Sequence, residues 1–195
     1  MKLTRIIPVF VIVLWFTAAC GRVISQTGSP KTRSIRQIEF SDFTFIRQDS
    51  AETIPLRNGR YEGSNDHSYW LMNTAYGDLT GDGIEEAIVL LRGQNTRTSP
   101  TQDEVFIYAL KDEKAVLLTN FEGGKRREYL VSVAPGGNFK VEDHLLVVDR
   151  AVLTDEHEYA PTHYYTIKYR WNGSHMVEVE RSALKLLPPS MMEIG

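Results

Sequence analysis

The pattern of hydrophobic and polar positions along the chain predicts a domain built mainly of β-strands. Short runs rich in β-branched and aromatic residues recur, and polar or glycine-containing segments separate them. No window of about twelve residues shows helical periodicity with caps. A short helix near residues 49–54 or 182–187 is the alternative, and neither would change the class. The polar segment 111–114 is short, so the strands on either side of it should form a hairpin. The expected strands cover residues 35–46, 68–76, 87–91, 104–110, 115–119, 128–133, 139–141, 145–153, 164–170 and 175–180.

The stretch "WNGS" near the C-terminus predicts a second hairpin. A two-residue turn on its Asn-Gly pair would mix apolar and polar residues on one face of the hairpin. A three-residue loop, 171–173 with Gly173 in the left-handed conformation, pairs Ile167 with Val177 instead. Because register is decided by keeping one face apolar, we expect the three-residue loop.

The first residues carry the features typical of an export signal in the usual order. Lys2 and Arg5 are basic, residues 6–16 are apolar apart from one proline, and residues 17–19 are small. The apolar run is too short to span a bilayer comfortably, since a spanning helix needs about 20 apolar residues. We therefore interpret residues 1–19 as a signal peptide rather than a buried N-terminal helix.

Cys20 is the single cysteine of the chain, so it has no intramolecular disulfide partner. Small residues directly before a cysteine, at the end of an export signal, resemble the lipobox of bacterial lipoproteins, with Thr17 where that family usually has an aliphatic residue. The resemblance implies that Cys20 is diacylated and anchors the protein to a membrane. Acyl chains anchor firmly because each buried CH₂ contributes about 0.8 kcal/mol. The rival interpretation is ordinary cleavage after Ala19, which leaves a soluble protein with a free thiol.

Residues 20–34 combine this cysteine with a tether, because residues 21–34 are rich in Gly, Ser, Thr and Pro. Fully extended, the tether could hold a domain up to roughly 45 Å from a membrane. The combination predicts an exported, membrane-anchored protein. By resemblance to lipoprotein sorting, Gly21 in place of Asp favours the outer membrane, on the periplasmic side, if the source is Gram-negative.

The rest of the chain is long enough for one domain with a real hydrophobic core, since about 160 residues follow the tether. We expect residues 35–187 to form one antiparallel all-β domain, a sandwich or an open barrel, or a β-rich α+β fold with one short helix. Residues 188–195 would be a C-terminal tail. The formal net charge of -3 argues against nucleic acid as a partner. The identity of a protein or glycan partner is left open.

One stretch, "YGDLTGDGIEEAIVLL" at residues 76–91, carries residues suited to a hard cation. Ca²⁺ prefers about six to eight oxygen ligands from carboxylates and backbone carbonyls. Alternate positions from Asp78 onward supply such oxygens, and Gly83 permits the sharp bend. An EF-hand needs Glu where Val89 stands, so the EF-hand interpretation fails.

The stretch instead resembles the calcium loops of FG-GAP and VCBS repeats, the integrin-type D-x-[DN]-x-D-G-x-x-[DE] segment between two strands. By that resemblance the cofactor is calcium, and the candidate ligands are Asp78, Thr80, Asp82, the Ile84 carbonyl and Glu86. Thr80 stands where Asn or Asp is usual, and Glu86 where Asp is commoner. Only one such loop occurs, and the chain has too few strands for a propeller, so no propeller is implied. The stretch also resembles exported bacterial proteins of unknown function with one such unit in a β-rich domain.

An ordinary turn is the alternative to a calcium site, because Asp and Gly are favoured in turns for reasons unrelated to metals. Asp82, Glu85 and Glu86 crowd beside Asp78 and would repel one another without a cation, which favours the ion. We expect any such site to be structural, since protein groups would fill all its ligand positions.

Other candidate chemistry is weaker. His157 and His163, near acidic residues 155, 156 and 158, fit no compact zinc spacing. The hydrolase motifs G-x-S-x-G and H-E-x-x-H do not occur in the sequence. We therefore expect a binding or structural module, with an envelope hydrolase and a lipoprotein inhibitor or assembly factor as alternatives. Aromatic residues that could form a glycan- or peptide-binding face, or fill the core, are Tyr61, Tyr69, Trp70, Tyr76, Tyr159, Tyr164, Tyr165 and Tyr169.

Overall fold

A computed structural model describes six segments of the chain, residues 34–63, 67–95, 102–122, 128–130, 139–153 and 161–188. The chain divides into two compact units, Met1–Lys31 and Thr32–Gly195, and every described residue belongs to the second unit. The predicted signal peptide, Cys20 and nearly all of the tether lie outside the described residues, as does the predicted strand end at 131–133.

A five-stranded antiparallel sheet occupies the middle of this unit, with the strand order β3-β4-β5-β6-β7. The predicted hairpin is confirmed, because β6 and β7 are joined by a two-residue turn in which Asp112 and Glu113 have positive φ. The short first strand was not predicted. The bounds are β3 Arg60–Glu62, β4 His67–Gly77, β5 Glu86–Asn95, β6 Gln102–Lys111 and β7 Lys114–Glu122.

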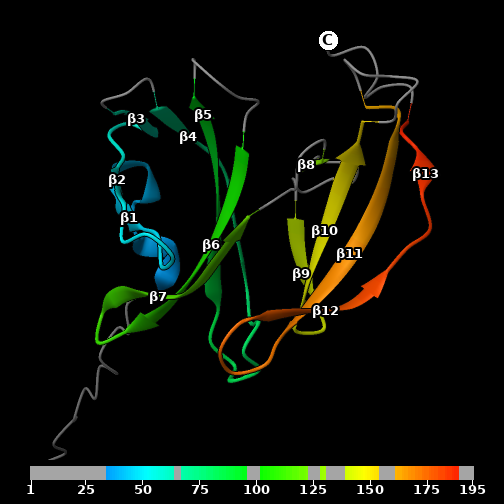
Figure 1. Ribbon diagram of the computed structural model, residues 1–195. Helices are drawn as coiled ribbons and strands as arrows, with labels where there is room; N and C mark the ends of the chain where they lie inside the picture. The colour runs from blue at the N-terminus through cyan, green and yellow to red at the C-terminus, as the bar shows by residue number, and fades with distance from the viewer. Residues whose placement is uncertain are drawn as a thin grey trace, which may run out of the picture. The chain divides into compact units, whose positions relative to one another are not determined.

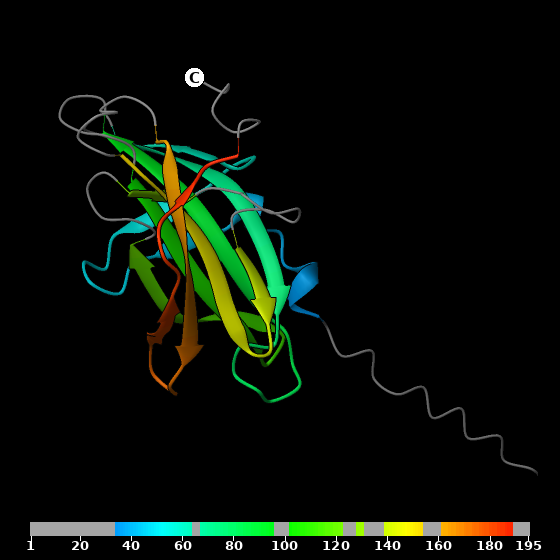
Figure 2. The ribbon, with the colours of Figure 1, turned by 90° about the vertical axis from the view of Figure 1, so that its right-hand side faces the viewer.

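A second antiparallel sheet has the order β12-β11-β10-β8, with β9 also paired to β10 and β13 to β11. Figure 2 shows this sheet in front of the five-stranded one, with strands running in roughly the same direction. Its bounds are β8 Glu128–Leu130, β9 Phe139–Glu142, β10 Leu145–Val152, β11 His163–Trp171, β12 Met176–Arg181 and β13 Lys185–Leu186.

The two sheets pack face to face around a common apolar core (Figure 1). Ile88 and Leu90 of β5 meet Phe139, Leu146 and Val148 of the second sheet in this core. The fold is therefore an all-β antiparallel sandwich, as the strand pattern predicts, and the described residues contain 3-10 turns but no α-helix. None of the described helical segments has the length and apolar character needed to cross a bilayer.

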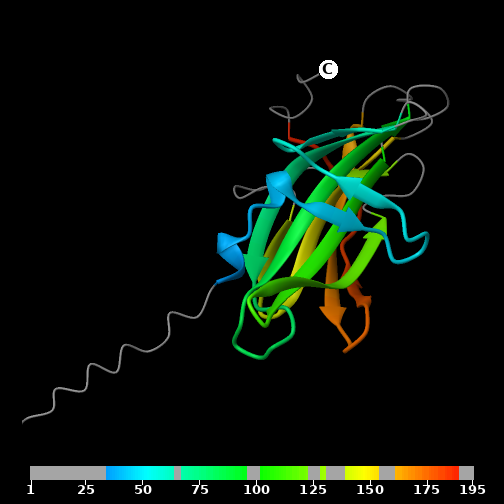
Figure 3. The ribbon, with the colours of Figure 1, turned by 90° about the vertical axis from the view of Figure 1, so that its left-hand side faces the viewer.

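The segment before β3 corrects one prediction, because residues 35–46 are not a single strand. Two 3-10 turns, η1 Ile35–Gln37 and η2 Phe40–Asp42, come before a short hairpin of β1 Thr44–Ile46 with β2 Thr53–Pro55. The turns form because the side chains of Ser34 and Glu39 accept hydrogen bonds from the Arg36 and Ser41 N–H groups. Figure 3 shows this N-terminal segment crossing the outer face of the five-stranded sheet.

The N-terminal segment creates a second apolar core on that outer face. Ile35, Phe40 and Phe45 are buried there against residues of β5 and β6. Phe45 packs edge-to-face on Phe106, with ring centroids 5.1 Å apart. Strand β5 is consequently buried on both faces, which explains the nearly unbroken apolar run after the polar loop.

The C-terminal hairpin has a register that differs from the predicted one. Trp171 pairs with Met176, so the loop contains four residues rather than three, and Ile167 lies opposite Arg181 rather than Val177. The Asn172 carboxamide oxygen closes the loop by accepting hydrogen bonds from the Ser174 and His175 N–H groups. Gly173 does take a positive φ, as expected.

The physical reason for this error is the position of β12. The prediction assumed that both valines of β12 pack inward, but β12 is an edge strand and Val177 and Val179 are 38 % and 46 % exposed. Apolar alternation could not fix the register, because the edge strand has no continuous buried face.

Gly77, the last residue of β4, is required by the packing of the two sheets. A Cβ atom at this position would lie 2.4 Å from the Cβ of Val141 on β9, well inside van der Waals contact. The glycine therefore lets the sheets approach at the end of the sandwich that carries the polar loop.

Replacing Gly77 with Ala should destabilise the fold by roughly 1–3 kcal/mol, the usual cost of overpacking a close contact. Urea denaturation of wild type, Gly77→Ala and Gly77→Ala/Val141→Gly measures this. With Val141→Gly measured as well, Gly77→Ala should cost less in the Val141→Gly background than in wild type, because the clashing side chain is gone there. A Gly77→Ala protein as stable as wild type would contradict the packing argument.

Candidate functional site

The polar loop, residues 78–85, connects β4 to β5 at one end of the sandwich. Gly77 and Glu86 form the last pair of the two strands, and the loop extends beyond them. Leu79 is buried between the sheets and holds the start of the loop against the core. Ile84, at the other side of the loop, has a 55 % exposed side chain.

Two aspartates of the loop bind its own backbone. Asp78 accepts hydrogen bonds from Gly81 N–H at 2.7 Å and from Gly83 N–H at 3.0 Å, one on each carboxylate oxygen. Asp82 accepts one from Ile84 N–H at 2.8 Å. Gly81 and Gly83 both have φ near +80°, a conformation that glycine adopts without strain.

Glu86 closes the loop from its far end. Its side chain is 1 % exposed, and one carboxylate oxygen accepts from the N–H groups of Leu79 at 2.8 Å and Thr80 at 3.1 Å. The Thr80 hydroxyl donates to the other oxygen at 3.3 Å. Burial raises the pKa of Glu86, whereas these hydrogen bonds favour the ionised form.

Glu85 points away from this cluster, which corrects the expected crowding of acidic groups. Its carboxylate receives two hydrogen bonds from the Arg36 guanidinium, each 2.7 Å long. These bonds lower the pKa of Glu85. The same guanidinium lies over the ring of Tyr76, 4.6 Å from its centroid. The charge of Glu85 is therefore compensated without a metal ion.

A histidine from the second sheet completes the surroundings of the loop. The turn between β9 and β10 consists of Asp143 and His144, which both have positive φ. His144 Nδ1 lies 2.8 Å from the Asp78 carbonyl oxygen and 3.4 Å from its carboxylate. Because a carbonyl only accepts, His144 Nδ1 carries the proton in this contact. The histidine thus joins the loop to the second sheet.

The carboxylates of this loop are engaged with donors of the loop itself. The Glu86, Asp78 and Asp82 carboxylates point their oxygens at N–H and O–H donors, whereas Ca²⁺ needs oxygens that converge on one point. In the part of the chain that the structure describes, no three His, Cys, Asp or Glu residues are grouped so as to hold a metal ion. The expected ligands Asp78, Thr80, Asp82, Ile84 and Glu86 do lie on one loop. Calcium binding stays a prediction from the motif.

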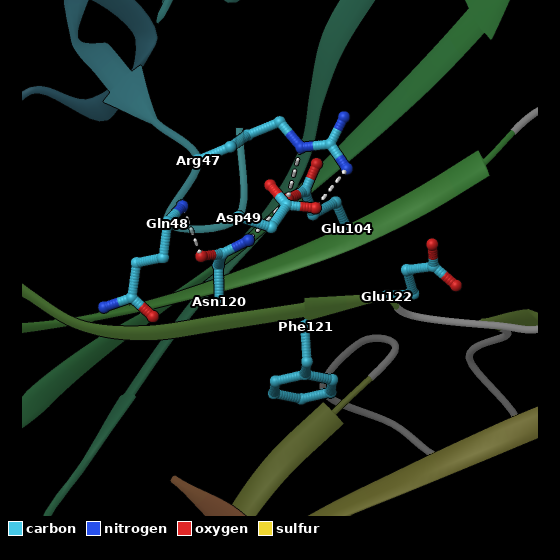
Figure 4. Close-up of a pocket in the computed structure, with 7 residues that line it drawn as sticks. All are labelled: Arg47, Gln48, Asp49, Glu104, Asn120, Phe121 and Glu122. Atoms are coloured by element: carbon cyan, nitrogen blue, oxygen red, sulfur yellow. Dashed lines mark hydrogen bonds and ion pairs between the residues drawn. The ribbon is translucent and has the colours of Figure 1, made fainter. Parts of the chain in front are cut away.

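A polar pocket of about 300 Å³ lies elsewhere, where the β1–β2 loop meets β6 and β7 (Figure 4). The loop supplies Arg47 to the pocket, β6 supplies Glu104, and β7 supplies Asn120. Figure 4 shows Phe121 pointing to the opposite side of β7, where it packs against Tyr169 of the second sheet. The other lining residues are Gln48, Asp49 and Glu122.

The charged groups of this pocket are bonded to one another. Arg47 forms ion pairs at 3.3 Å with Glu104, Asp49 and Glu52. Asn120 donates to Glu104 at 2.7 Å and accepts from the Gln48 N–H at 3.0 Å. The network therefore fastens the N-terminal hairpin to the sheet. Burial raises the pKa of the Glu104 carboxyl.

The other candidate groups from the sequence are divided among different parts of the fold. His157 lies outside the described residues, so the zinc hypothesis cannot be assembled from them; His163 Nδ1 contacts the Thr162 hydroxyl at 2.9 Å. The described aromatics form no single face. Tyr61, Tyr69 and Tyr76 pack in the core under the N-terminal segment, and Tyr169 packs in the core between the two sheets. The Arg60 guanidinium lies over Trp70. Tyr164 and Tyr165 belong to β11, and Tyr159 lies outside the described residues.

Sequence reasoning missed several contacts that only the fold creates. Arg36 and His144 lie far from the loop in sequence, so no local pattern could show them. Glu104 offered only a weak signal, as the charged residue that directly precedes the apolar run 105–110 of β6. An S-x-x-K spacing at Ser182–Lys185 was also overlooked. The Ser182 hydroxyl donates to the Ala183 carbonyl, and Lys185 lies over the Tyr164 ring, so the structure does not pair them as nucleophile and base.

Comparison of the chain with protein-family models, with curated proteins and with solved structures found no match.

The pH dependence of stability should reveal the buried Glu104. The pKa of Glu104 is higher in the folded state than the value of about 4.3 typical of unfolded chains. At a pH between these two pKa values, the folded protein holds a proton that the unfolded chain has released. Its stabilising contribution is present below about pH 4.3 and is lost as the pH rises through the folded-state pKa. Urea denaturation between pH 4 and 7.5 should show wild type losing stability relative to Glu104→Gln as the pH increases. A difference between the two proteins that stays constant over this range would contradict the assignment.

Proposed function

We propose that this protein is an exported lipoprotein of the bacterial cell envelope that presents a β-sandwich as a binding or structural module. The lipid on Cys20 would anchor it to the membrane, the outer membrane if the source is Gram-negative. Its partner would be a protein or a glycan.

The observation that carries the membrane part of the proposal is the place where the packed domain begins. Ile35 and Phe40 are core residues, and η1 lies against β5, so the fold starts almost directly after the predicted tether. Arg36 then binds Glu85 and stacks on Tyr76, which fixes the point of chain entry. Because the domain is packed from its first residues, only the short segment after Cys20 would separate it from a lipid anchor. This arrangement supports the proposed membrane attachment.

The described polar groups of the loop and the pocket bond to other parts of the fold. This favours a binding or structural module over an enzyme. In the loop, the Asp78 and Glu86 carboxylates accept hydrogen bonds from backbone N–H groups. In the pocket, Glu104 pairs with Arg47 and accepts a hydrogen bond from Asn120. These bonds stabilise the fold by joining separate elements of it.

Replacing Cys20 with Ser should release the protein from membranes. In a bacterium that processes lipoproteins, the full-length wild type should incorporate labelled palmitate and sediment with membranes, and Cys20→Ser should do neither. The matched control is Cys20→Ser/Ser25→Cys, which keeps one thiol but moves it away from the small residues. This control should remain unlabelled, because the position of the cysteine matters as well as its thiol. Wild-type protein that is soluble and carries a free thiol would favour cleavage after Ala19 and overturn the proposal.

A further inference from the structure

The two residues at which the loop departs from the calcium-loop pattern contact each other. Thr80 replaces Asn or Asp, and Glu86 replaces the commoner Asp. The Thr80 hydroxyl donates to the Glu86 carboxylate at 3.3 Å, across the loop. The departures are therefore one coupled feature of this chain rather than two separate losses.

The longer side chain of Glu86 explains what this pair does. Glu86 is the first residue of β5, and its carboxylate reaches the N–H groups of Leu79 and Thr80 on the opposite limb of the loop. An aspartate would be one methylene shorter and could not make these contacts without moving the backbone. Glu86 is also almost fully buried, so the hydrogen bonds form away from competing water.

The electrostatics of the loop interior are opposite to those of a cation site. A bound cation draws carboxylate and carbonyl oxygens inward. In this loop the buried Glu86 carboxylate accepts from N–H and O–H donors, and the Asp78 carboxylate accepts from the Gly81 and Gly83 amides. Of the two remaining acidic groups, Asp82 accepts from the Ile84 N–H, and Glu85 is neutralised by Arg36.

We infer that the Thr80–Glu86 pair closes the loop in place of a metal ion, so that this end of the sandwich keeps its shape without calcium. The closed loop is joined to the N-terminal segment through Arg36 and to the second sheet through His144. This inference does not depend on the lipid anchor.

Thermal melting of the wild-type protein tests the inference directly. The melting temperature should agree within about 1 °C in EDTA and in excess CaCl₂, with MgCl₂ as the control for ionic strength. By mass action, an ion present at about a hundred times its Kd would raise the melting temperature by roughly 5–10 °C. A calcium-specific rise of that size would overturn the inference.

Changing the pair back to the calcium pattern gives a second test. Thr80→Asp/Glu86→Asp should melt several degrees below wild type in EDTA, because the shorter carboxylate loses the Leu79 and Thr80 amides. Calcium should restore part of this loss, since the loop now matches D-x-D-x-D-G-x-x-D. Glu85→Asp is a matched control outside the pair: it shortens the carboxylate that binds Arg36, so it can lower the melting temperature, but it should show no response to calcium. A double variant that melts with wild type in EDTA would show that Glu86 does not close the loop.

A milder variant keeps the test decisive if the double variant fails to fold. Thr80→Val removes only the hydroxyl bond to Glu86 and should lower the melting temperature equally in EDTA and in CaCl₂. A loss that appears only in CaCl₂ would instead identify Thr80 as a calcium ligand and overturn the inference.

Discussion

The burial of β5 on both faces is the constraint on which the rest of the domain depends. Ile88 and Leu90 face the second sheet, and Val89 and Leu91 face the N-terminal segment. Fully burying an aliphatic side chain of this kind stabilises a fold by roughly 1.5–3 kcal/mol. Neither face of the central sheet could be left to water, so the chain supplies a cover for each. The N-terminal segment is thus part of the core, although it forms little regular structure.

Because the central sheet is covered on both faces, its buried carboxylates need partners within the protein. An isolated buried charge is costly, and it is tolerated when hydrogen bonds and an opposite charge surround it. Glu86 at the start of β5 meets backbone donors, Glu104 on β6 meets Arg47 and Asn120, and Asp103 meets Arg92 in a bidentate pair on the neighbouring strands. Each buried carboxylate therefore joins two elements. The loop and the pocket are similar in this respect, since both attach peripheral segments to the central sheet.

The strand positions could be predicted because alternation and turn residues are local signals. The β6–β7 hairpin follows from a short polar segment, and the apolar run after the loop follows from a buried strand. The C-terminal register could not be predicted, because Val177 and Val179 lie on an edge strand where apolarity does not indicate burial. The acidic loop was harder still. Sequence shows that its carboxylates are neighbours, but not that Glu85 turns outward to Arg36.

By itself, the sequence determined the all-β class, most of the strands and the polar loop between β4 and β5, because each depends on residues close together in the chain. The tertiary structure alone decided which groups the loop uses. Thr80 and Glu86 are close in sequence, yet their bond depends on the β4–β5 register that brings Gly77 opposite Glu86. Arg36 and His144 reach the loop only after three layers have packed. A motif fixes which side chains are available, and the partners that each one finds are fixed by contacts distant in sequence.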